Sequence, residues 1–315
     1  MARERDDLPK NERYRRLLNN DGLADGRSLY SDAWARLKKD KLALAGLVII
    51  LVFVLLAIFA PLMPFVDPEA IESRREVGGE TLLPPYAPSL KNLMGTDQLG
   101  RDILARVLYG IRVSLLVGVV ARGLTMLLGV TLGVVSAYYG GWVDTLIMRL
   151  TDIFLAFPVM LLAMVITLIL KPSLMTVCVA IMLVGWPDVT RLIRGQALKL
   201  KSKDYVRASR ALGARDSWII LRQILPNCLS LMIVSFSMGV PGAIMYEAGM
   251  SFFGYGIQAP TPSLGNMIAD ARGYMTVCPW YILFPGLALV LLVVAFNIFG
   301  DGLNDALDPY AKRRS

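Results

Sequence analysis

Six long apolar stretches constrain the fold of this chain more than any other feature. They cover, approximately, residues 42–62, 113–137, 147–170, 174–191, 229–250 and 281–299. Each has about the 20 residues that a helix needs to cross a bilayer core of about 30 Å. Hydrocarbon offers the backbone no hydrogen-bond partner, and the strands of a membrane barrel would alternate polar and apolar residues instead. The sequence therefore predicts an all-α, polytopic membrane protein with six transmembrane helices.

Composition agrees with a membrane protein and argues against several other classes. Hydrophobic residues make up 55% of the 315 residues and charged residues only 18%, which is too apolar for a soluble chain. A net charge of +8 would suggest nucleic acid as a partner of a soluble protein, but here Lys and Arg cluster between the apolar stretches, so no nucleic acid is expected. The chain has no His, and Cys178, Cys228 and Cys278 stand singly, so neither a zinc site nor His-based catalysis is expected.

The basic residues also predict an orientation. The loop at 192–228 is dense in them, and the last residues include Lys312, Arg313 and Arg314, so both segments are placed in the cytoplasm together with the N-terminus. The predicted organisation is a basic cytoplasmic tail at 1–41, a first transmembrane helix at 42–62, an extracytoplasmic segment at 63–111, a core at 112–303 and a cytoplasmic tail at 304–315. Within the first tail, residues 31–41 read either as an amphipathic surface helix or as a disordered segment.

The polar loop between the fourth and fifth stretches has strong local helix signals. Asp204 or Ser202 can cap a helix, residues 205–212 contain no helix breaker, and Gly213 suits a left-handed turn at the helix end. A second helix is expected from about residue 216 to residue 225, with Pro226 at its junction with the next span. The first helix either projects as a docking element for a soluble partner or lies against its own transmembrane neighbours, and the residues alone leave both interpretations open.

This loop resembles the EAA loop of ABC importer permeases. That pattern has a small-residue triplet, a glycine after three further residues, and Leu-Pro after another helical segment; here these are Arg207-Ala208-Ser209, Gly213 and Leu225-Pro226. The chain departs from the pattern in three places. Arg207 replaces an acidic residue, Ser209 replaces an alanine, and Gln223 replaces an isoleucine.

Other strings along nearly the whole chain carry the same resemblance. They are Gly95-Thr96-Asp97-Gln98-Leu99-Gly100-Arg101-Asp102, Tyr138-Tyr139-Gly140-Gly141-Trp142-Val143-Asp144, Gln258-Ala259-Pro260-Thr261-Pro262, and the segment from Phe296 through Asn304-Asp305-Ala306-Leu307-Asp308-Pro309. Together they resemble the oligopeptide, dipeptide and nickel branch of these permeases. Within that branch, they resemble the oligopeptide permease C subunit.

The resemblance implies a type I importer permease of the MetI-like kind, with a five-helix core plus one N-terminal helix. It implies a bacterial inner or plasma membrane location, and as partners a homologous permease, two ATPase subunits and an extracytoplasmic substrate-binding protein. ATP-driven closure of the ATPase pair would move the EAA helices and switch the cavity between outward and inward access. The residues it assigns to ATPase coupling are Asp204, Tyr205, Arg207, Ala208, Ser209, Ala211, Leu212, Gly213, Leu225 and Pro226.

The energy source is expected to lie outside this polypeptide. The chain contains no GxxxxGK[ST] phosphate loop, so it is not expected to be an enzyme, and no cofactor is expected on it. Mg-ATP would bind the partner ATPase subunits. In the second apolar stretch, Gly129 and Gly133 form a GxxxG pair that predicts a close helix approach, within the chain or with another subunit.

Ionisable residues inside the apolar stretches are a second set of candidates. Arg122 lies nine residues into its stretch, roughly 14 Å along a helix and so near mid-membrane. Glu247, toward the outer end of the fifth stretch, is its candidate ion-pair partner by depth. Arg122 is expected to face the translocation pathway or a subunit interface, although related permeases usually have an apolar residue there and a snorkelling or helix-pinning arginine is the alternative. Unchanged uptake and assembly in Arg122→Leu would rule out the transport role.

The sequence favours import of oligopeptides, with dipeptides, nickel or another small solute as alternatives. A secondary transporter would need intramembrane carboxylates or unwound ion sites and often shows inverted repeats, and no repeat is found. A membrane scaffold without transport is the third class. Co-purification discriminates among them, because ATPase subunits and a related permease would support an importer, whereas a lone active protein would support a secondary carrier.

Overall fold

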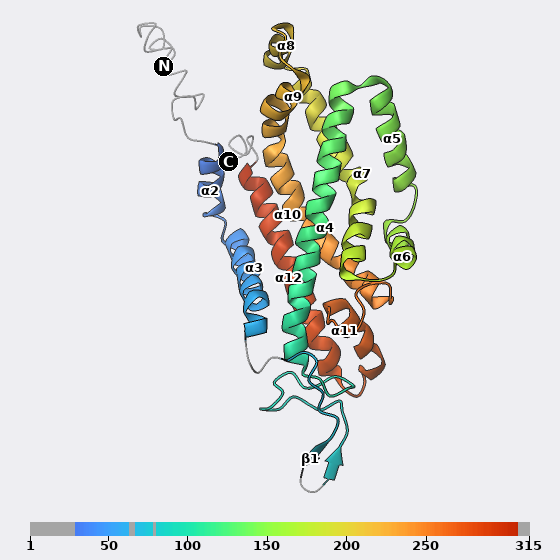
Figure 1. The fold of residues 1–315 in the computed structure, drawn as a ribbon. Coiled ribbons are helices and arrows are strands. Elements are labelled where there is room, and N and C mark those ends of the chain that lie inside the picture. The colour runs from blue at the N-terminus through green and yellow to red at the C-terminus, as the bar shows by residue number, and fades with distance from the viewer. Residues whose placement is uncertain (1–28, 63–66, 78–79, 308–315) are drawn as a thin grey trace, which may run out of the picture.

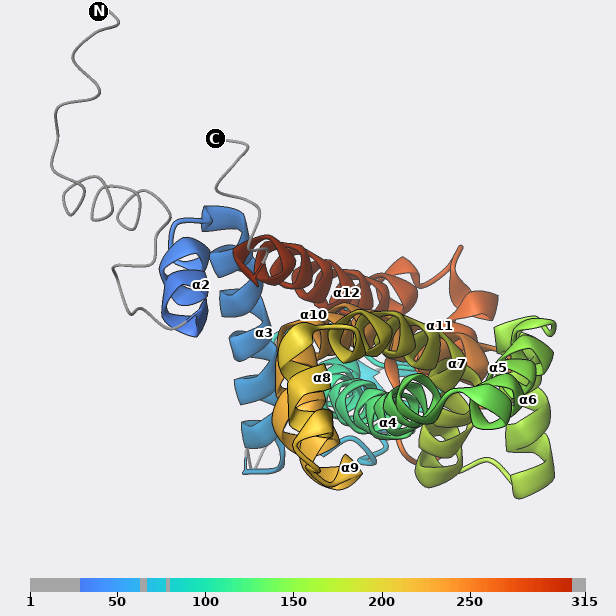
Figure 2. The ribbon, with the colours of Figure 1, turned by 90° about the horizontal axis from the view of Figure 1, so that it is seen from above.

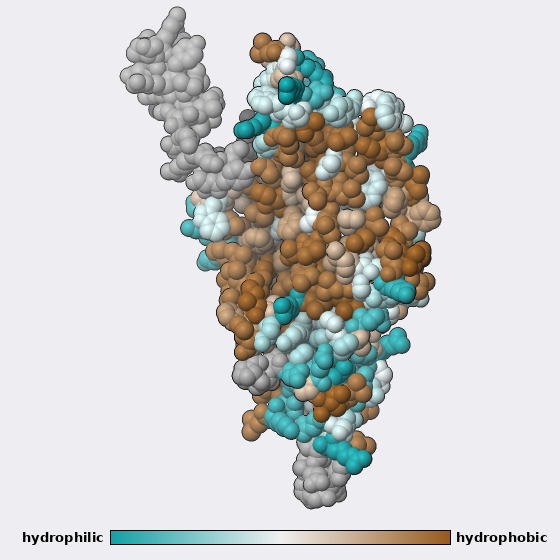
Figure 3. Space-filling view, in the orientation of Figure 1, coloured by the Kyte–Doolittle hydropathy of each residue, from teal (hydrophilic) through white to brown (hydrophobic). Residues whose placement is uncertain are grey.

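The computed structural model describes residues 29–62, 67–77 and 80–307. Long helices run side by side and form a bundle whose middle is covered by apolar side chains, while polar side chains gather at its two ends (Figures 1 and 3). This is the surface that a bilayer requires, because apolar residues face hydrocarbon and polar residues face water or headgroups. The predicted all-helical membrane fold is confirmed, with one short hairpin of strands outside the bundle.

Five helices are long and apolar enough to cross a membrane. They are α3 (Lys41–Phe59, followed by a short 3-10 turn at Ala60–Leu62), α4 (Ile103–Tyr139), α7 (Leu174–Lys201), α10 (Leu225–Phe252) and α12 (Pro279–Leu307). With 37 residues, α4 is about 55 Å long, well beyond a hydrocarbon core of about 30 Å. It begins at Ile103, so the last part of the predicted 63–111 segment is already helical.

The stretch predicted as a single helix at 147–170 is broken. α5 (Gly141–Leu155) and α6 (Val159–Leu170) meet at 92°. Pro158 lacks an N–H and restricts the backbone of Phe157, which favours a break at this point. With 12 residues, α6 is about 18 Å long and cannot cross the bilayer alone. The six-helix prediction therefore holds only if α5 and α6 count as one broken span.

The central helix α4 packs against α7, α10 and α3, and α12 packs against both α3 and α10 (Figure 2). The predicted close approach at Gly129 and Gly133 is made within the chain, because a Cβ on Gly129 would lie 2.6 Å from Cβ of Val189 on α7. Thr190 also donates a hydrogen bond of 3.2 Å to the Gly129 carbonyl. The two glycines thus allow α4 and α7 to touch through their backbones.

At one end of the bundle lie α2 (Leu29–Leu37), the last turns of α12, and the loop helices α8 (Asp204–Ala211) and α9 (Asp216–Ile219) (Figure 1). The helical interpretation of residues 31–41 is confirmed up to Leu37, which packs with Ala33, Ala43 and Ala306. The tails at 1–28 and 308–315 lie outside the described residues.

The opposite end of the bundle carries the hairpin of β1 (Arg75–Val77) and β2 (Glu80–Leu82), paired antiparallel with Glu76 opposite Thr81. It also carries α11 (Leu264–Ala271), capped by Ser263, and a 3-10 turn at Arg272–Tyr274. The string at residues 95–102 leads directly into α4 here, and its last residue, Asp102, caps that helix. Asp97 is fully buried; its carboxylate accepts 2.9 Å bonds from the N–H groups of Leu99 and Arg101 and lies 2.6 Å from Nε of Arg101 and 3.5 Å from Nε of Arg106. That string therefore has a structural role.

Candidate functional site

The predicted docking helix exists and ends as expected. α8 runs over Asp204–Ala211, and Gly213 has φ +78°, the left-handed conformation that glycine adopts without a steric penalty. The Ala214 N–H donates 3.1 Å to the Ser209 carbonyl and the Gly213 N–H donates 3.0 Å to the Arg210 carbonyl, which satisfies carbonyls that a helix end leaves free. The predicted left-handed turn at Gly213 is confirmed.

The predicted side-chain cap of this helix is wrong. Lys203 occupies the N-cap position and makes no capping hydrogen bond, while the Ser202 hydroxyl donates to the Lys199 carbonyl at 2.9 Å. Asp204 is instead the first helical residue, where a carboxylate is favourable beside the free N–H groups of the first turn.

α8 has one buried and one exposed face. Val206 is 4% exposed and joins the apolar cluster formed by the ends of α4 and α7. Tyr205 and Leu212, by contrast, are 45% and 89% exposed, and Ala208 between them is exposed as well. These three positions have the i, i+3, i+7 spacing of one helix face. A partner can therefore reach a stripe of two large apolar side chains around a small residue.

The second loop helix is not separate from the next span. α9 passes into a π-helical turn at Ile220–Ile224 and then directly into α10, so residues 216–252 form one helix. The Leu225 N–H donates to the Ile220 carbonyl, a wide i to i+5 bond, one residue before Pro226. Pro226 has no N–H to give, and the widened turn accommodates it inside the helix. The predicted junction at Pro226 is therefore a local irregularity within the continuous helix at 216–252.

Two of the three departures from the EAA pattern contact each other. The side-chain amide of Gln223 donates a 2.6 Å hydrogen bond to the Ser209 hydroxyl, which itself donates 3.0 Å to the Tyr205 carbonyl. The Oε1 atom of Gln223 is buried and has no hydrogen-bond partner among the described residues. A side-chain hydrogen bond thus joins α8 to the π-helical turn that leads into α10.

Tyr138, at the end of α4, anchors the loop to the bundle. Its hydroxyl donates to the Asp216 carboxylate at 2.5 Å, and its ring lies 5.1 Å from the Arg210 guanidinium and 5.8 Å from the Lys201 ammonium. Lys201 also donates to the carbonyls of Ala137 and Tyr138, at 3.1 and 2.6 Å, which are free at the end of α4. Sequence reasoning missed Tyr138 as a site residue, although it begins one of the strings that carried the resemblance.

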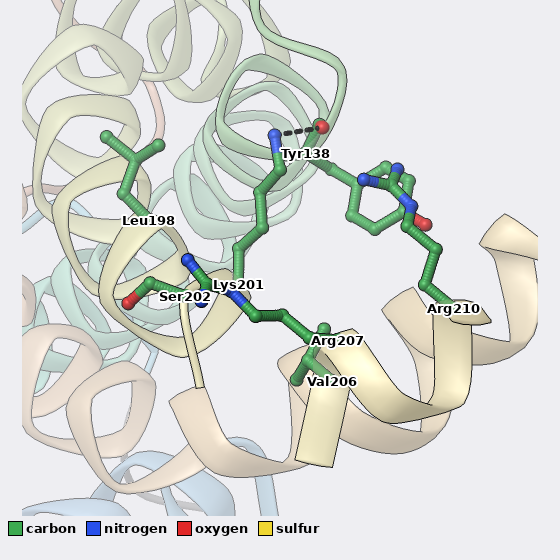
Figure 4. A pocket seen from close by; sticks show the side chains of 7 residues that line it. All are labelled: Tyr138, Leu198, Lys201, Ser202, Val206, Arg207 and Arg210. Carbon is green, nitrogen blue, oxygen red and sulfur yellow. Dashed lines mark hydrogen bonds between the residues drawn. The ribbon is translucent and has the colours of Figure 1, made fainter. Parts of the chain in front are cut away.

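Tyr138, Lys201 and Arg210 line a pocket of about 350 Å³ between α8 and the ends of α4 and α7 (Figure 4). Arg207 lines it too, and its side chain forms no hydrogen bond or ion pair with any residue that the structure describes. The resemblance assigned Arg207 to ATPase coupling, and Arg210 lies one turn further along α8. The structure places both in the wall of this pocket.

Arg122 and Glu247 are not brought together. Nη2 of Arg122 donates 2.7 and 2.8 Å bonds to the carbonyl and hydroxyl oxygens of Ser235 on α10, and its Nε is buried without a partner in the described part of the chain. Glu247 is fully buried and accepts bonds from Ser251 at 2.7 Å and from Ser114 at 3.2 Å. The predicted ion pair is wrong, whereas a pathway or interface role for either residue stays a prediction.

A bundle with an apolar girdle, one broken span and a basic pair of loop helices at one end defines a multi-span membrane protein. Residues 129–313 match the family model of binding-protein-dependent transport system inner membrane components, and residues 28–88 match the N-terminal transmembrane domain of oligopeptide transport permease C. The chain belongs to this family of inner membrane transport components.

Relatives support the same membership over most of the chain. A dipeptide transport system permease protein of Alkalihalophilus pseudofirmus is 43% identical, with 90% of this chain and 91% of the relative covered. An oligopeptide transport system permease protein of Bacillus subtilis is 39% identical (91% and 91%), and a glutathione transport system permease protein of Pectobacterium atrosepticum is 38% identical (91% and 93%). The fold is similar to a chain of the inward-facing MetNI methionine ABC transporter, with a TM-score of 0.54 at 19% identity, covering 64% of this chain and 96% of that one.

Proposed function

We propose that this chain is one transmembrane subunit of an ATP-driven peptide importer in a bacterial inner membrane. The relatives reported above are named as permeases for dipeptides, oligopeptides and glutathione, which are all peptides or peptide-like. In this proposal α2, α8 and the end of α12 are cytoplasmic. The density of Lys and Arg from residue 194 to residue 222 supports that orientation.

One observation carries the mechanism: α8 presents an exposed stripe and is tied to a helix that continues unbroken into the membrane. The stripe of Tyr205, Ala208 and Leu212 is free to enter a cleft of a soluble subunit. Because Gln223 joins α8 to the start of α10, a displacement of α8 would be passed to α10. The chain would thereby convert closure of an ATPase pair into a change of access to the substrate path.

The proposed partners supply the functions that this chain is not expected to perform itself. Two ATPase subunits would bind Mg-ATP, a homologous permease would complete the path, and an extracytoplasmic binding protein would deliver the substrate. The large apolar side chains exposed along the spanning helices would be covered by lipid and by the second permease.

Oligopeptides are the proposed substrates, with dipeptides as the second candidate. The match of residues 28–88 to the N-terminal domain of oligopeptide permease C favours the first class, whereas the 43% identity to a dipeptide permease favours the second. Nickel remains an alternative with no specific support among these relatives.

The experiment is purification of the tagged chain from its native membrane, followed by uptake measurements in vesicles. We expect two ATPase subunits and a related permease to co-purify, and ATP-dependent accumulation of labelled oligopeptides when the cognate binding protein is present. Accumulation of dipeptides alone would contradict the oligopeptide assignment. ATP-independent uptake by the chain on its own would overturn the importer.

A further inference from the structure

The basic pocket beside Tyr138 is lined by none of the residues of the exposed stripe Tyr205, Ala208 and Leu212 that is proposed to dock on an ATPase. Lys201, Arg207 and Arg210 bring three positive charges to it, and Leu198 and Val206 add apolar walls. Asp216 accepts the Tyr138 hydroxyl and lies 3.9 Å from the Arg210 guanidinium, and Asp144, which interacts electrostatically with Lys201, is itself paired with Arg194 at 2.6 Å. The described part of the chain therefore leaves an excess of positive charge around a cavity of about 350 Å³.

The three cations are held to different degrees. Lys201 is fixed by two backbone carbonyls, and Arg210 by the Tyr138 ring and the more distant Asp216. Arg207 has neither kind of contact within the described residues, so its five N–H donors are available to a ligand. A planar guanidinium suits two oxygens of one anion, as in a phosphate.

The position of the pocket indicates which anion it meets. Tyr139 and Trp142, which follow Tyr138, are 56% and 76% exposed, and aromatic side chains of this kind gather at the headgroup level of a bilayer. The apolar surface of the bundle gives way to polar side chains at this end (Figure 3). The pocket lies between α8 and the ends of α4 and α7, and its Tyr138 is next in the chain to Tyr139. We take this neighbourhood to mean that the pocket lies near the headgroup level, where phospholipid phosphates lie.

We infer that this pocket binds the phosphate of an anionic phospholipid, with Arg207 as its main ligand. Clusters of basic residues just outside a membrane span attract anionic lipids, and each Lys or Arg near the surface contributes about fivefold in affinity. Because the bound headgroup would touch both α8 and the ends of α4 and α7, it would steady the loop helices against the bundle. This inference concerns the chain alone and does not rest on the proposed importer function.

The test is native mass spectrometry of the purified full-length chain, titrated with phosphatidylglycerol or with phosphatidylcholine of the same acyl chains. The wild type is expected to retain phosphatidylglycerol at least about fivefold more strongly. Arg207→Gln should remove most of this preference and Arg207→Lys should keep part of it. Arg215→Gln is the matched control, since Arg215 lies on the same exposed loop outside the pocket.

Three results would overturn the inference. One is equal retention of phosphatidylglycerol by the wild type and Arg207→Gln, and another is an equal loss in Arg207→Gln and Arg215→Gln. The third is displacement of the lipid by inorganic phosphate in an Arg207-dependent manner, which would assign the pocket to a soluble phosphate. An unchanged thermal unfolding midpoint in Arg207→Gln, expected because Arg207 is exposed, excludes misfolding as the cause of a loss.

Discussion

At Gly213 the backbone conformation requires glycine, whereas the neighbouring atoms would leave room for a side chain. Its φ is +78°, yet a Cβ added there would meet no atom within 4 Å. Gly213→Ala should therefore destabilise the loop by about 1–2 kcal/mol through backbone strain alone. Gly195→Ala is the matched control, because Gly195 is equally open but lies inside α7, where alanine is favoured by up to about 1 kcal/mol. The midpoint of thermal unfolding of the purified chain should fall in Gly213→Ala and rise in Gly195→Ala. A shift of the same sign in both variants would contradict this explanation.

Arg122 shows how far a residue's role can be predicted from sequence. Counting along the apolar stretches predicted a place near mid-membrane, and Arg122 is the twentieth of the 37 residues of α4. The partner of Arg122 depends on how α4 and α10 are rotated about their axes, and counting residues along the chain does not give that rotation. The guanidinium lies against Gly239 and bonds Ser235. Glu247 is eight residues beyond Gly239, about 12 Å further along α10, and is surrounded by serine hydroxyls instead.

At the scale of elements, the hydrogen bond between Ser209 on α8 and Gln223 in the π-helical turn predicts that substitutions of these two residues have coupled effects on stability. Ser209→Ala leaves the Gln223 amide without its partner, and a buried unpaired amide costs about 1–3 kcal/mol. Gln223→Ile alone removes the same bond with a smaller cost, because the remaining Ser209 hydroxyl still bonds the Tyr205 carbonyl. The double variant Ser209→Ala, Gln223→Ile restores the usual family residues and should recover most of the stability.

A double-mutant cycle on thermal unfolding of the chain measures this coupling directly. The expected interaction energy is about 1 kcal/mol or more, within the range for residues in contact. Strictly additive effects would show that the hydrogen bond carries no coupling between the two helices. Asn227→Ala is a useful control, since Asn227 bonds the Gln223 carbonyl and not its side chain.

The positions of the elements were predicted better than their ends. Hydropathy located the apolar part of each span, but α4 and α7 extend well past it, because their outer turns are stabilised by contacts with α11, α5 and the loop helices. The break at Phe157 and Pro158 falls inside a stretch that was predicted as a single helix. Composition does not reveal whether neighbouring elements support a bend of 92°.

At the scale of the whole molecule, the sequence predicted the class of fold, the loop helix α8 and its glycine turn. It could not predict that Tyr138 on α4 and Asp216 on α9, 78 residues apart, would join the loop to the bundle. It likewise could not show that Ser209 and Gln223 compensate each other. Both contacts arise only when distant helices pack, and a single sequence contains no periodic signal for them.

The central claim is that α8 transmits work from an ATPase to the membrane helices. The most direct measurement is the ratio of peptide uptake to ATP hydrolysis in the reconstituted complex carrying Ala208→Glu, which places a charge in the exposed stripe of α8. Ala87→Glu, also exposed but at the opposite end of the molecule, is the control. We predict that Ala208→Glu lowers this ratio at least about tenfold, equivalent to about 1.4 kcal/mol of lost coupling, with normal membrane insertion. An unchanged ratio in Ala208→Glu, equal to that of Ala87→Glu, would contradict the account.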